Sequence, residues 1–416
     1  MKKENNKTVN LCIFSNYGYS LYNKRSDVLF GGAEVQLFLL ANQLVKDQKI
    51  KVHIIIGKKE FQFNKIETYN DIKLYVSIPV EKSIINYIKG GINLFLTLLK
   101  LNPDVIIQRT GGIQTFLIAL YSQIFRKKFI FSIAHERAVS KRGFSRLIQP
   151  FFNLSLNYAD FIVTQNKDQL QLFKQWRGRK FNKVKTIKSG YEIEDKELNL
   201  KNKESILWVG RAKRWKRPEL FLKIAKLFPK ESFVMICKLK ENDEYSDSIF
   251  QEAELIKNLK FIKFVPFNNI DVYFQKAKVL INTSSKEGFP NTFIQAIKNK
   301  TPLISLNVDP EHFIEDYKCG FFCNDDIRIL KKKLNNLLNN KKFYKELSNN
   351  CFKYAKENHD IKKTAGEWRD LIFKIAQINI VRIIRKKYIL HFFTFHAKKL
   401  CNIFSRRIYL IKKKKF

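Results

Sequence analysis

Two short segments contain residues that could bind a phosphorylated ligand. In the first, Arg211 ends an apolar run, and Lys216 comes just before an expected helix start at Pro218. An arginine offers a fork of N–H groups and a lysine offers a compact charge, so the pair suits the oxygens of a diphosphate. A basic loop that is merely solvated is the competing interpretation.

The second segment, residues 284–296, joins an expected strand to an expected helix. Glu287 lies in the loop, and Pro290 suits the first helical turn, which leaves the N–H groups of Asn291 and Thr292 available to a ligand. Gln295 lies two turns into the helix. Alternatively, the carboxylate of the loop only balances the helix dipole.

Two further features could contribute to the same chemistry. Gly31 and Gly32 open a helix pattern that contains Glu34, and they allow the backbone to approach an anion at the helix start. His135 follows another strand pattern, where it could donate a hydrogen bond to a substrate. Each feature also occurs in proteins that bind nothing at these positions.

Short β-type runs alternate with helix-period segments, which is typical of parallel sheets covered by helices. In the first half we expect strands at residues 9–16, 51–57, 72–78, 104–110, 128–134, 160–166 and 184–190, and a helix at 31–48. In the second half we expect strands at 205–211, 232–238, 259–265, 278–284 and 301–307, and helices at 216–228, 270–276 and 290–299. The polar stretch 192–204 between the halves is interpreted as a linker. The sequence therefore predicts an α/β protein with two doubly wound domains, whose ligands lie beyond the carboxyl ends of the strands.

The composition narrows the class of protein. With 45% hydrophobic and 28% charged residues among 416, the chain is expected to fold into ordered domains. The net charge of +40 implies an anionic partner, although A- and T-rich coding DNA would also enrich lysine. A nucleic-acid-binding protein is the alternative from another class, but it fits poorly because the basic residues concentrate in one loop and the C-terminal tail.

Cysteines and apolar runs indicate the compartment. The scattered cysteines favour reduced thiols and disfavour a zinc site; they are Cys12, Cys237, Cys319, Cys323, Cys351 and Cys401. The N-terminal apolar run is too short for a signal peptide. No uninterrupted apolar run in the sequence reaches the ~20 residues that a membrane-spanning helix needs. We therefore expect a soluble or peripheral protein in the cytoplasm.

The C-terminal segment has a composition of its own. After Asp370 it has no acidic residue, whereas basic residues continue to Lys415 among aromatic and aliphatic ones such as Tyr388 and Phe393. Such a cationic amphipathic element suits the surface of an anionic membrane. The alternative is a crossing helix on the first domain, followed by a frayed lysine tail.

Taken together, these motifs resemble glycosyltransferase family 4, the retaining enzymes with the GT-B fold. The resemblance covers the chain to about residue 370. It rests on Gly-Gly-Ala-Glu at 31–34, on Gly-Arg with the following Lys-Arg-Pro-Glu-Leu at 210–220, and on Glu-Gly-Phe-Pro-Asn-Thr-Phe-Ile-Gln-Ala at 287–296. The last stretch looks like bacterial surface-polysaccharide enzymes. The fold implied is two Rossmann-like domains that face a central cleft: an acceptor-side domain at 1–192, a nucleotide-sugar domain at 205–365, and a crossing helix with a membrane-associating tail at 366–416.

The resemblance also implies roles for individual residues. Arg211 and Lys216 would bind the donor diphosphate, Glu287 would hold hydroxyls of the transferred sugar, and His135 would contact the same sugar. The remaining donor-binding positions are Gly31, Gly32, Glu34, Pro266, Phe267, Gly288, Phe289, Pro290, Asn291, Thr292 and Gln295. The family carries a glutamate where this chain has Gln295, and that change would weaken the hold on the ribose.

The implied reaction needs no metal and no cofactor besides the nucleotide-sugar donor, and the chain has no Asp-x-Asp pair to hold an ion. The expected acceptor is a glycan or a polyprenyl-diphosphate-linked sugar at the inner face of the cell membrane. The alternatives are a GT-B relative that binds a nucleotide sugar without transferring it, and an epimerase of similar architecture.

Overall fold

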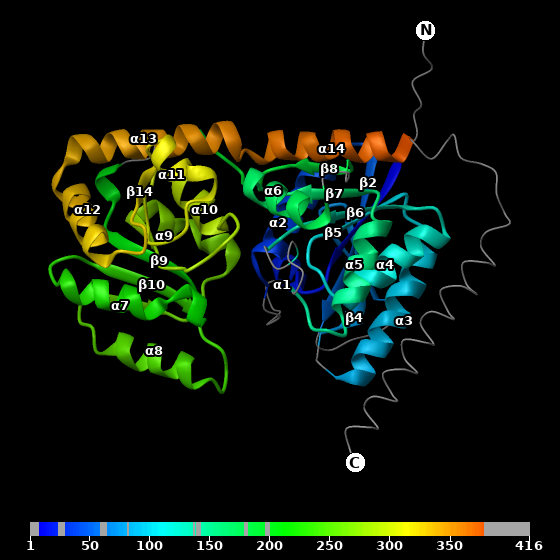
Figure 1. The fold of residues 1–416 in the computed structure, drawn as a ribbon, viewed down its shortest axis with the longest axis horizontal. Helices are drawn as coiled ribbons and strands as arrows, with labels where there is room; N and C mark the ends of the chain where they lie inside the picture. Colours follow the sequence, from blue (N-terminus) through cyan, green and yellow to red (C-terminus); the bar gives the residue numbers. More distant parts are fainter. Residues whose placement is uncertain are drawn as a thin grey trace, which may run out of the picture.

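The computed structural model describes residues 8–23, 30–58, 65–80, 83–135, 138, 143–178, 182–195 and 200–377. They form two domains, each built on one mainly parallel sheet with helices on both faces (Figure 1). The predicted α/β class with two Rossmann-like domains is confirmed. Residues 378–416, which contain the expected membrane-associating tail, lie outside the described residues, as does Glu136.

The N-terminal domain holds an eight-stranded sheet in the order β3-β4-β2-β1-β5-β6-β7-β8. Its elements are β1 (Val9–Ser15), α1 (Tyr19–Tyr22), α2 (Gly32–Leu44), β2 (Ile50–Lys58), β3 (Lys65–Tyr69), β4 (Ile72–Pro79), α3 (Ile84–Leu101), β5 (Val105–Gln108), α4 (Ile113–Ile124), β6 (Lys128–Ser132), α5 (Gln149–Tyr158), β7 (Phe161–Thr164), α6 (Lys167–Arg177) and β8 (Val184–Thr186). Strands β1 and β5 are buried almost throughout. That burial explains their continuous apolar sequence, because central parallel strands are covered on both faces.

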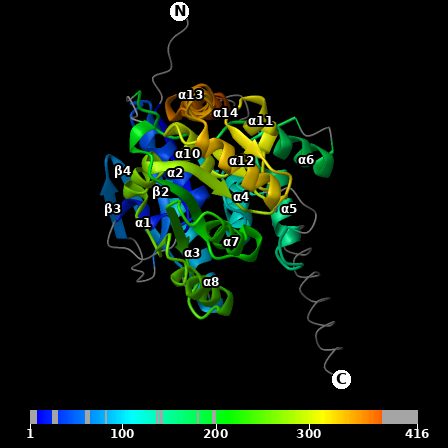
Figure 2. The ribbon, with the colours of Figure 1, turned by 90° about the vertical axis from the view of Figure 1, so that its left-hand side faces the viewer.

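The C-terminal domain holds a six-stranded parallel sheet in the order β11-β10-β9-β12-β13-β14, the strand order of a nucleotide-binding Rossmann fold. Its first part comprises η2 (Leu200–Asn202), β9 (Ser205–Arg211), η3 (Arg214–Lys216), α7 (Pro218–Leu227), β10 (Phe233–Lys238), α8 (Glu244–Glu254), β11 (Leu259–Ile262), η4 (Phe267–Asn269), α9 (Asp271–Lys276) and β12 (Ala277–Asn282). The second part comprises α10 (Asn291–Lys298), β13 (Leu303–Ser305), η5 (Pro310–His312), α11 (Phe313–Asp316), β14 (Gly320–Phe322), α12 (Ile327–Asn339), α13 (Lys341–Asn358) and α14 (Ile361–Gln377). Figure 2 views this domain from its outer side, with α7, α8 and α12 toward the reader.

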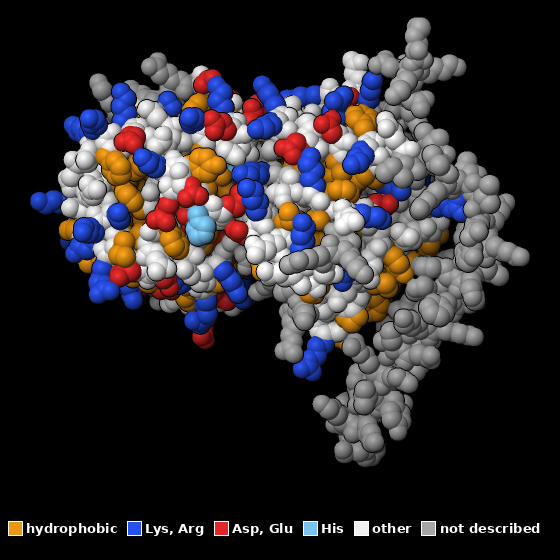
Figure 3. Space-filling model, turned by 45° about the horizontal axis from the view of Figure 1, so that its top comes forward, with side chains coloured by type: hydrophobic (Ala, Val, Ile, Leu, Met, Phe, Trp, Pro, Cys, Tyr) orange, Lys and Arg blue, Asp and Glu red, His pale blue; other side chains and the backbone are white. Residues whose placement is uncertain are grey.

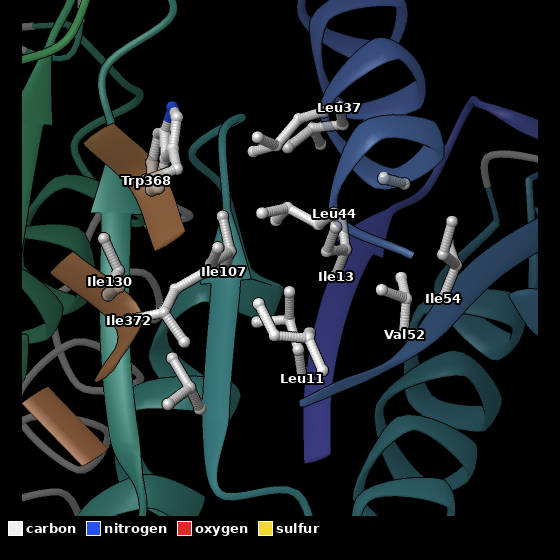
Figure 4. Packing of buried hydrophobic residues seen from close by; sticks show 14 of the residues in the cluster. Leu11, Ile13, Leu37, Leu44, Val52, Ile54, Ile107, Ile130, Trp368 and Ile372 are labelled. Carbon is white, nitrogen blue, oxygen red and sulfur yellow. The ribbon is translucent and has the colours of Figure 1, made fainter. Parts of the chain in front are cut away.

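The chain crosses between the domains twice, and the two crossings are tied together. Tyr191 donates its N–H to the carbonyl of His359 at 2.8 Å, and Ile361 donates its N–H to the carbonyl of Tyr191 at 2.9 Å. Helix α13 lies on the C-terminal domain, whereas α14 returns to the N-terminal domain (Figure 1). Trp368 and Ile372 of α14 enter the same apolar cluster as Leu11, Leu44 and Ile107, which completes the N-terminal core (Figure 4).

Two features differ from the sequence expectation. Strand β3 was not predicted: its sequence is polar because it is the edge strand, and it pairs antiparallel with β4 through a turn at Asn70 and Asp71, both at positive φ. Lys203, in the expected polar linker, is buried, and its ammonium donates to the carbonyl of Asn299 at 2.9 Å and to the hydroxyl of Thr301 at 2.7 Å. Burial lowers the pKa of Lys203 to about 7.

Two further properties concern the described residues alone. Their cysteines are all buried, free thiols. Their helices include none that is both long and apolar enough to cross a membrane.

Candidate active site

A carboxylate in the loop after β12 meets the basic loop that follows β9. The two strands are neighbours in the sheet, so the loops at their carboxyl ends come together. The Glu287 carboxylate lies 2.6 Å from the Lys216 ammonium, and both side chains are largely shielded, at 12% and 15% exposure. Glu287 also accepts hydrogen bonds from the Ser284 hydroxyl at 2.6 Å and from the Asn282 amide at 3.1 Å. The carboxylate is therefore fixed in place before any ligand arrives.

The two loops are also joined through their backbones. Thr283 donates its hydroxyl to the carbonyl of Lys216 at 2.7 Å and accepts from the Trp208 indole at 3.0 Å. Ser285 donates its N–H to the carbonyl of Trp215 at 2.8 Å. These bonds hold Lys216 and Glu287 on one rigid support, which is what a preorganised charge site needs.

Arg211 reaches from the C-terminal domain to the start of α2. Its guanidinium donates to the carbonyl of Phe30, directly before the two glycines. Gly31 donates its N–H to the Glu34 carboxylate at 2.8 Å, so this helix start is already capped by its own side chain. Glu34 is 5% exposed. The predicted residues Arg211, Gly31 and Glu34 thus lie together at the junction of the domains.

The start of α10 contacts the start of α2 across that junction. Asn291 donates its amide to the carbonyl of Gly32 at 2.9 Å and accepts from the amide of Gln36 at 3.2 Å. A side chain at Gly32 would come within 2.5 Å of the Asn291 amide, and one at Gly288 within 2.6 Å of the Gln169 amide. A β-carbon at either position would therefore displace the facing amide side chain of the other domain.

Helix α10 begins without a side-chain cap, after Pro290. Thr292 in its first turn is partly exposed, and Gln295 farther along is buried at 5% exposure. Phe289 is buried against Phe313, with ring centroids 5.0 Å apart. Phe293 donates its N–H to the carbonyl of Pro290 at 3.0 Å, and no side chain caps this helix start, so its positive dipole end can face an anion.

His135 and Phe267 contact the opposite domain through aromatic rings. The His135 ring, three residues after β6, lies edge-on to Trp215 of the basic loop, with centroids 6.2 Å apart. Phe267 follows Pro266 and lies edge-on to Phe38 of α2 at 6.0 Å. The predicted positions from the two domains therefore converge on one junction. A surface hollow of about 520 Å³ between the end of α2 and α14 contains none of them.

Sequence reasoning missed a buried polar network beside this junction. The Arg109 guanidinium is 6% exposed and donates to the hydroxyl of Ser189 at 3.0 Å, and its Nε has no hydrogen-bond partner among the described residues. Burial lowers the pKa of Arg109 to about 10, against the opposing influence of Glu34. Ser189 in turn donates to the amide of Gln165 at 3.1 Å. The available signal was an arginine near the end of the expected strand at 104–110, but its partners come from distant segments.

Comparisons with known proteins agree with this architecture. Residues 191–357 match the family model described as "Glycosyl transferases group 1". A Campylobacter jejuni relative is 24% identical over 360 residues, which cover 83% of this chain and 96% of the relative. It is the α-1,4-N-acetyl-D-galactosaminyltransferase named for GalNAc-α-(1→4)-GalNAc-α-(1→3)-diNAcBac-PP-undecaprenol.

Two solved structures share the fold. Sucrose-phosphate synthase from Thermosynechococcus elongatus superposes with a TM-score of 0.72 at 15% identity, over 88% of this chain and 99% of that one. Anabaena HepE in complex with UDP-glucose gives a TM-score of 0.68 at 14% identity, over 88% of this chain and 100% of that one. With a group 1 glycosyl transferase domain at residues 191–357 and the GT-B arrangement of its two domains, this chain is a glycosyltransferase.

Proposed function

We propose that this glycosyltransferase is a retaining member of glycosyltransferase family 4, which moves a sugar from a nucleoside-diphosphate donor to a glycan or a polyprenyl-diphosphate-linked acceptor. The observation that carries the proposal is the contact between Lys216 and Glu287. The Glu287 carboxylate also accepts hydrogen bonds from Ser284 and Asn282. A cation for a diphosphate and an acceptor of hydroxyl hydrogen bonds for a sugar stand side by side there. The arrangement fits the diphosphate and the sugar of a nucleotide sugar.

In the proposed reaction the bond between the anomeric carbon and the diphosphate oxygen breaks, and a bond from the acceptor hydroxyl forms on the same face. The acceptor proton passes to the departing diphosphate, so no protein nucleophile is consumed. Arg211, Lys216 and the first turn of α10 stabilise the negative charge that develops on the leaving group. Rate enhancement comes from charge placed in advance and from the positioning of both substrates.

The same cations make the proposed reaction independent of a divalent metal. The described residues contain no group of three histidine, cysteine or acidic side chains that could hold an ion. The role that a metal would play in neutralising the diphosphate falls to Lys216 and Arg211. Turnover in excess EDTA is expected to equal turnover with added magnesium.

A relative and the net charge support the proposed acceptor and location. The Campylobacter relative is named for a diphospho-undecaprenol-linked glycan, and this chain has a net charge of +40. We therefore place the enzyme in cell-surface polysaccharide assembly, in the cytoplasm at the inner face of the membrane. Its basic C-terminal tail would attract anionic lipids by roughly 1 kcal/mol per cation near the surface.

A thermal-shift screen of the purified chain with UDP-, GDP-, ADP- and CMP-sugars tests the donor class. A donor present at 100 times its dissociation constant stabilises the protein by ~2.7 kcal/mol. HepE was solved with UDP-glucose, so a UDP-sugar is the first candidate. If no nucleotide sugar shifts the unfolding temperature, the donor assignment fails.

A second measurement tests the stereochemistry and the alternative of a non-transferring relative. The anomeric configuration of the product, read by NMR from the coupling at the anomeric carbon, is expected to match that of the donor. An inverted product would remove the family 4 assignment. Donor binding without transfer or hydrolysis would favour the binding-protein alternative.

A further inference from the structure

Glu311 reaches from the C-terminal domain to the first turn of α6 in the N-terminal domain. Its carboxylate accepts the N–H of Lys167 at 2.6 Å, and its own N–H donates to the carboxylate of Asp168 at 2.9 Å. Each of the two segments therefore supplies one carboxylate and one N–H to the other. The dipole of α6 adds to the attraction, because a carboxylate is stabilised at the N-terminus of a helix.

Helix α6 does not need Glu311 in order to begin. The side chain of Asn166 already caps this helix, since it accepts the N–H of Gln169 at 2.8 Å. The Glu311 carboxylate binds a further N–H at the same helix start from the other domain, and its side chain is only 13% exposed. We therefore interpret the bond as a contact between the domains rather than as part of the helix.

The backbone at Glu311 has an unfavourable conformation. Glu311 and His312 have φ angles of +57° and +53°, so both lie in the left-handed region, which costs free energy for residues other than glycine. Pro310 precedes them, and the carboxylate of Asp309 accepts the N–H of Ile314 at 2.9 Å, so both ends of the turn are fixed. Strain of this kind persists where the surrounding structure enforces it, and it is typical of functional contacts.

The charges on the two sides of this contact are opposite. Glu315 and Asp316 are exposed close to Glu311 in the sequence, and Figure 3 shows acidic side chains beside a histidine on the C-terminal half of the molecule. From the N-terminal domain, Lys188 places its ammonium 3.4 Å from the Glu311 carboxylate and also donates to the side-chain oxygen of Asn358 at 3.1 Å. Lys188 precedes the first crossing between the domains, and Asn358 ends α13 before the second. The ion pair therefore connects Glu311 to the crossings about which the domains could turn.

The turn at Glu311 is tied to the loop after β12, which belongs to the proposed donor site. The two follow neighbouring strands, β13 and β12, and the amide of Asn307 donates to the carbonyl of Ser285 at 2.9 Å. The first turn of α6 faces the same loop, because a β-carbon at Gly288 would lie 2.6 Å from the amide of Gln169. A shift of Glu311 along α6 would therefore also move this loop against the N-terminal domain.

We propose that Glu311 is a positioning residue of this transferase. Its contacts with Lys167, Asp168 and Lys188 form a clamp, which holds the two domains together and keeps the donor site assembled before the donor binds. A ligand that binds only the assembled state loses apparent affinity in proportion to the fraction of protein in that state. Loss of the clamp lowers this fraction, whereas saturating donor restores it, so the effect should fall on donor affinity and spare kcat. The effect on the donor rests on the proposed function, but the clamp itself does not.

Hydrogen exchange in the donor-free full chain tests the clamp without any assumption about the donor. The reporter is the amide hydrogen of Lys167, whose intrinsic exchange rate is unaffected by a change at Glu311. In Glu311→Ala its exchange should accelerate by at least ~10-fold, the size of one hydrogen bond to a charged group. Glu311→Gln keeps a neutral acceptor and should give an intermediate rate. Asp168→Ala should also accelerate the exchange, and it leaves the strained turn unaltered.

Donor affinity and turnover are measured next. A nucleotide sugar found in the thermal-shift screen is titrated by calorimetry, and kcat is measured at saturating donor for variants that show a cooperative unfolding transition. We expect the donor Kd to rise by ~10-fold in Glu311→Ala and by less in Glu311→Gln, whereas kcat stays within about twofold of the parent. The matched control is Glu315→Ala, which removes an exposed carboxylate of the same segment and should match the parent in exchange, Kd and kcat.

Parental exchange at Lys167 in both Glu311→Ala and Asp168→Ala overturns the proposal. Faster exchange with parental donor affinity overturns it as well, because the clamp would then not position the donor site. So does a fall in kcat at unchanged KM, which would give Glu311 a direct part in the chemistry. If no nucleotide sugar binds the parent, the proposed donor class fails, and the exchange rates alone then decide whether the clamp holds the domains.

Discussion

Replacement of Lys216 by alanine tests the proposed charge stabilisation most directly. The mutation removes an ammonium that lies 2.6 Å from the Glu287 carboxylate, in a pair that is only 15% and 12% exposed. Loss of one preorganised contact to a leaving group costs at least ~100-fold in turnover, or ~2.7 kcal/mol of activation free energy. Glu287 keeps its bonds from Ser284 and Asn282, so we expect only about 1–3 kcal/mol of lost folding stability.

The assay compares kcat at saturating donor for the parent and for Lys216→Ala, each shown to be folded by its unfolding transition. Lys226→Ala is the matched control. Its ammonium pairs with Glu252 at 2.8 Å in the same domain, but the two side chains are 52% and 34% exposed. Exposed ion pairs contribute little to folding stability, so this variant should keep nearly the parental free energy of unfolding. It should also keep the parental kcat.

A double-mutant cycle with Glu287→Gln extends the test. If Lys216 and Glu287 act on one bound nucleotide sugar, the double variant should lose less activity than the product of the two single losses. Parental kcat in folded Lys216→Ala would refute the charge argument. Independent, multiplying losses would show that the two residues do not act as a unit.

Three further predictions concern the junction of the domains and the pH response. Asn291→Ala removes the hydrogen bonds to Gly32 and Gln36, so the donor-free protein should adopt a larger radius of gyration in small-angle X-ray scattering. Gln295→Glu should tighten nucleotide binding by about fivefold, since a charge-assisted bond to the ribose exceeds a neutral one by about 1 kcal/mol; calorimetry showing unchanged or weaker affinity would contradict the assigned ribose contact. Burial lowers the pKa of His359 from 6.5 to about 3, so only the unfolded chain takes up this proton between those pH values. The free energy of unfolding should therefore fall by about 2 kcal/mol more between pH 7 and 5 in the parent than in His359→Asn, as measured by urea titration.

The strands of the sheets, and the part of the site that follows directly from their order, could be predicted from the sequence. Buried parallel strands need continuous apolar runs, so β1, β5 and β12 are visible in the sequence. Strands β9 and β12 are neighbours, so the loops that follow them must meet, and the contact between Lys216 and Glu287 follows from the topology. The polar edge strand β3 lacked this signal, because one of its sides needs no apolar cover.

The contacts between the domains could not be predicted from one sequence. The edge-on contact of His135 with Trp215, and the bond from Arg211 to the carbonyl of Phe30, depend on how the two domains pack. Nothing in the local pattern at Arg109 or Ser189 specifies a partner 80 residues away. Three-dimensional packing decides such pairs. The residue type shows that a side chain is polar, but it does not show which residue that side chain will contact.

The return of α14 to the first domain has a consequence for biosynthesis. Trp368 and Ile372 cover apolar surface of a domain whose strands are complete by Thr186. At a synthesis rate of about 5–20 residues per second, a ribosome needs roughly 10–40 s to add the intervening chain. During that interval the nascent N-terminal half exposes the apolar surface that α14 later covers, so we expect chaperones to bind it. Truncation before this helix should yield aggregates rather than a smaller working enzyme.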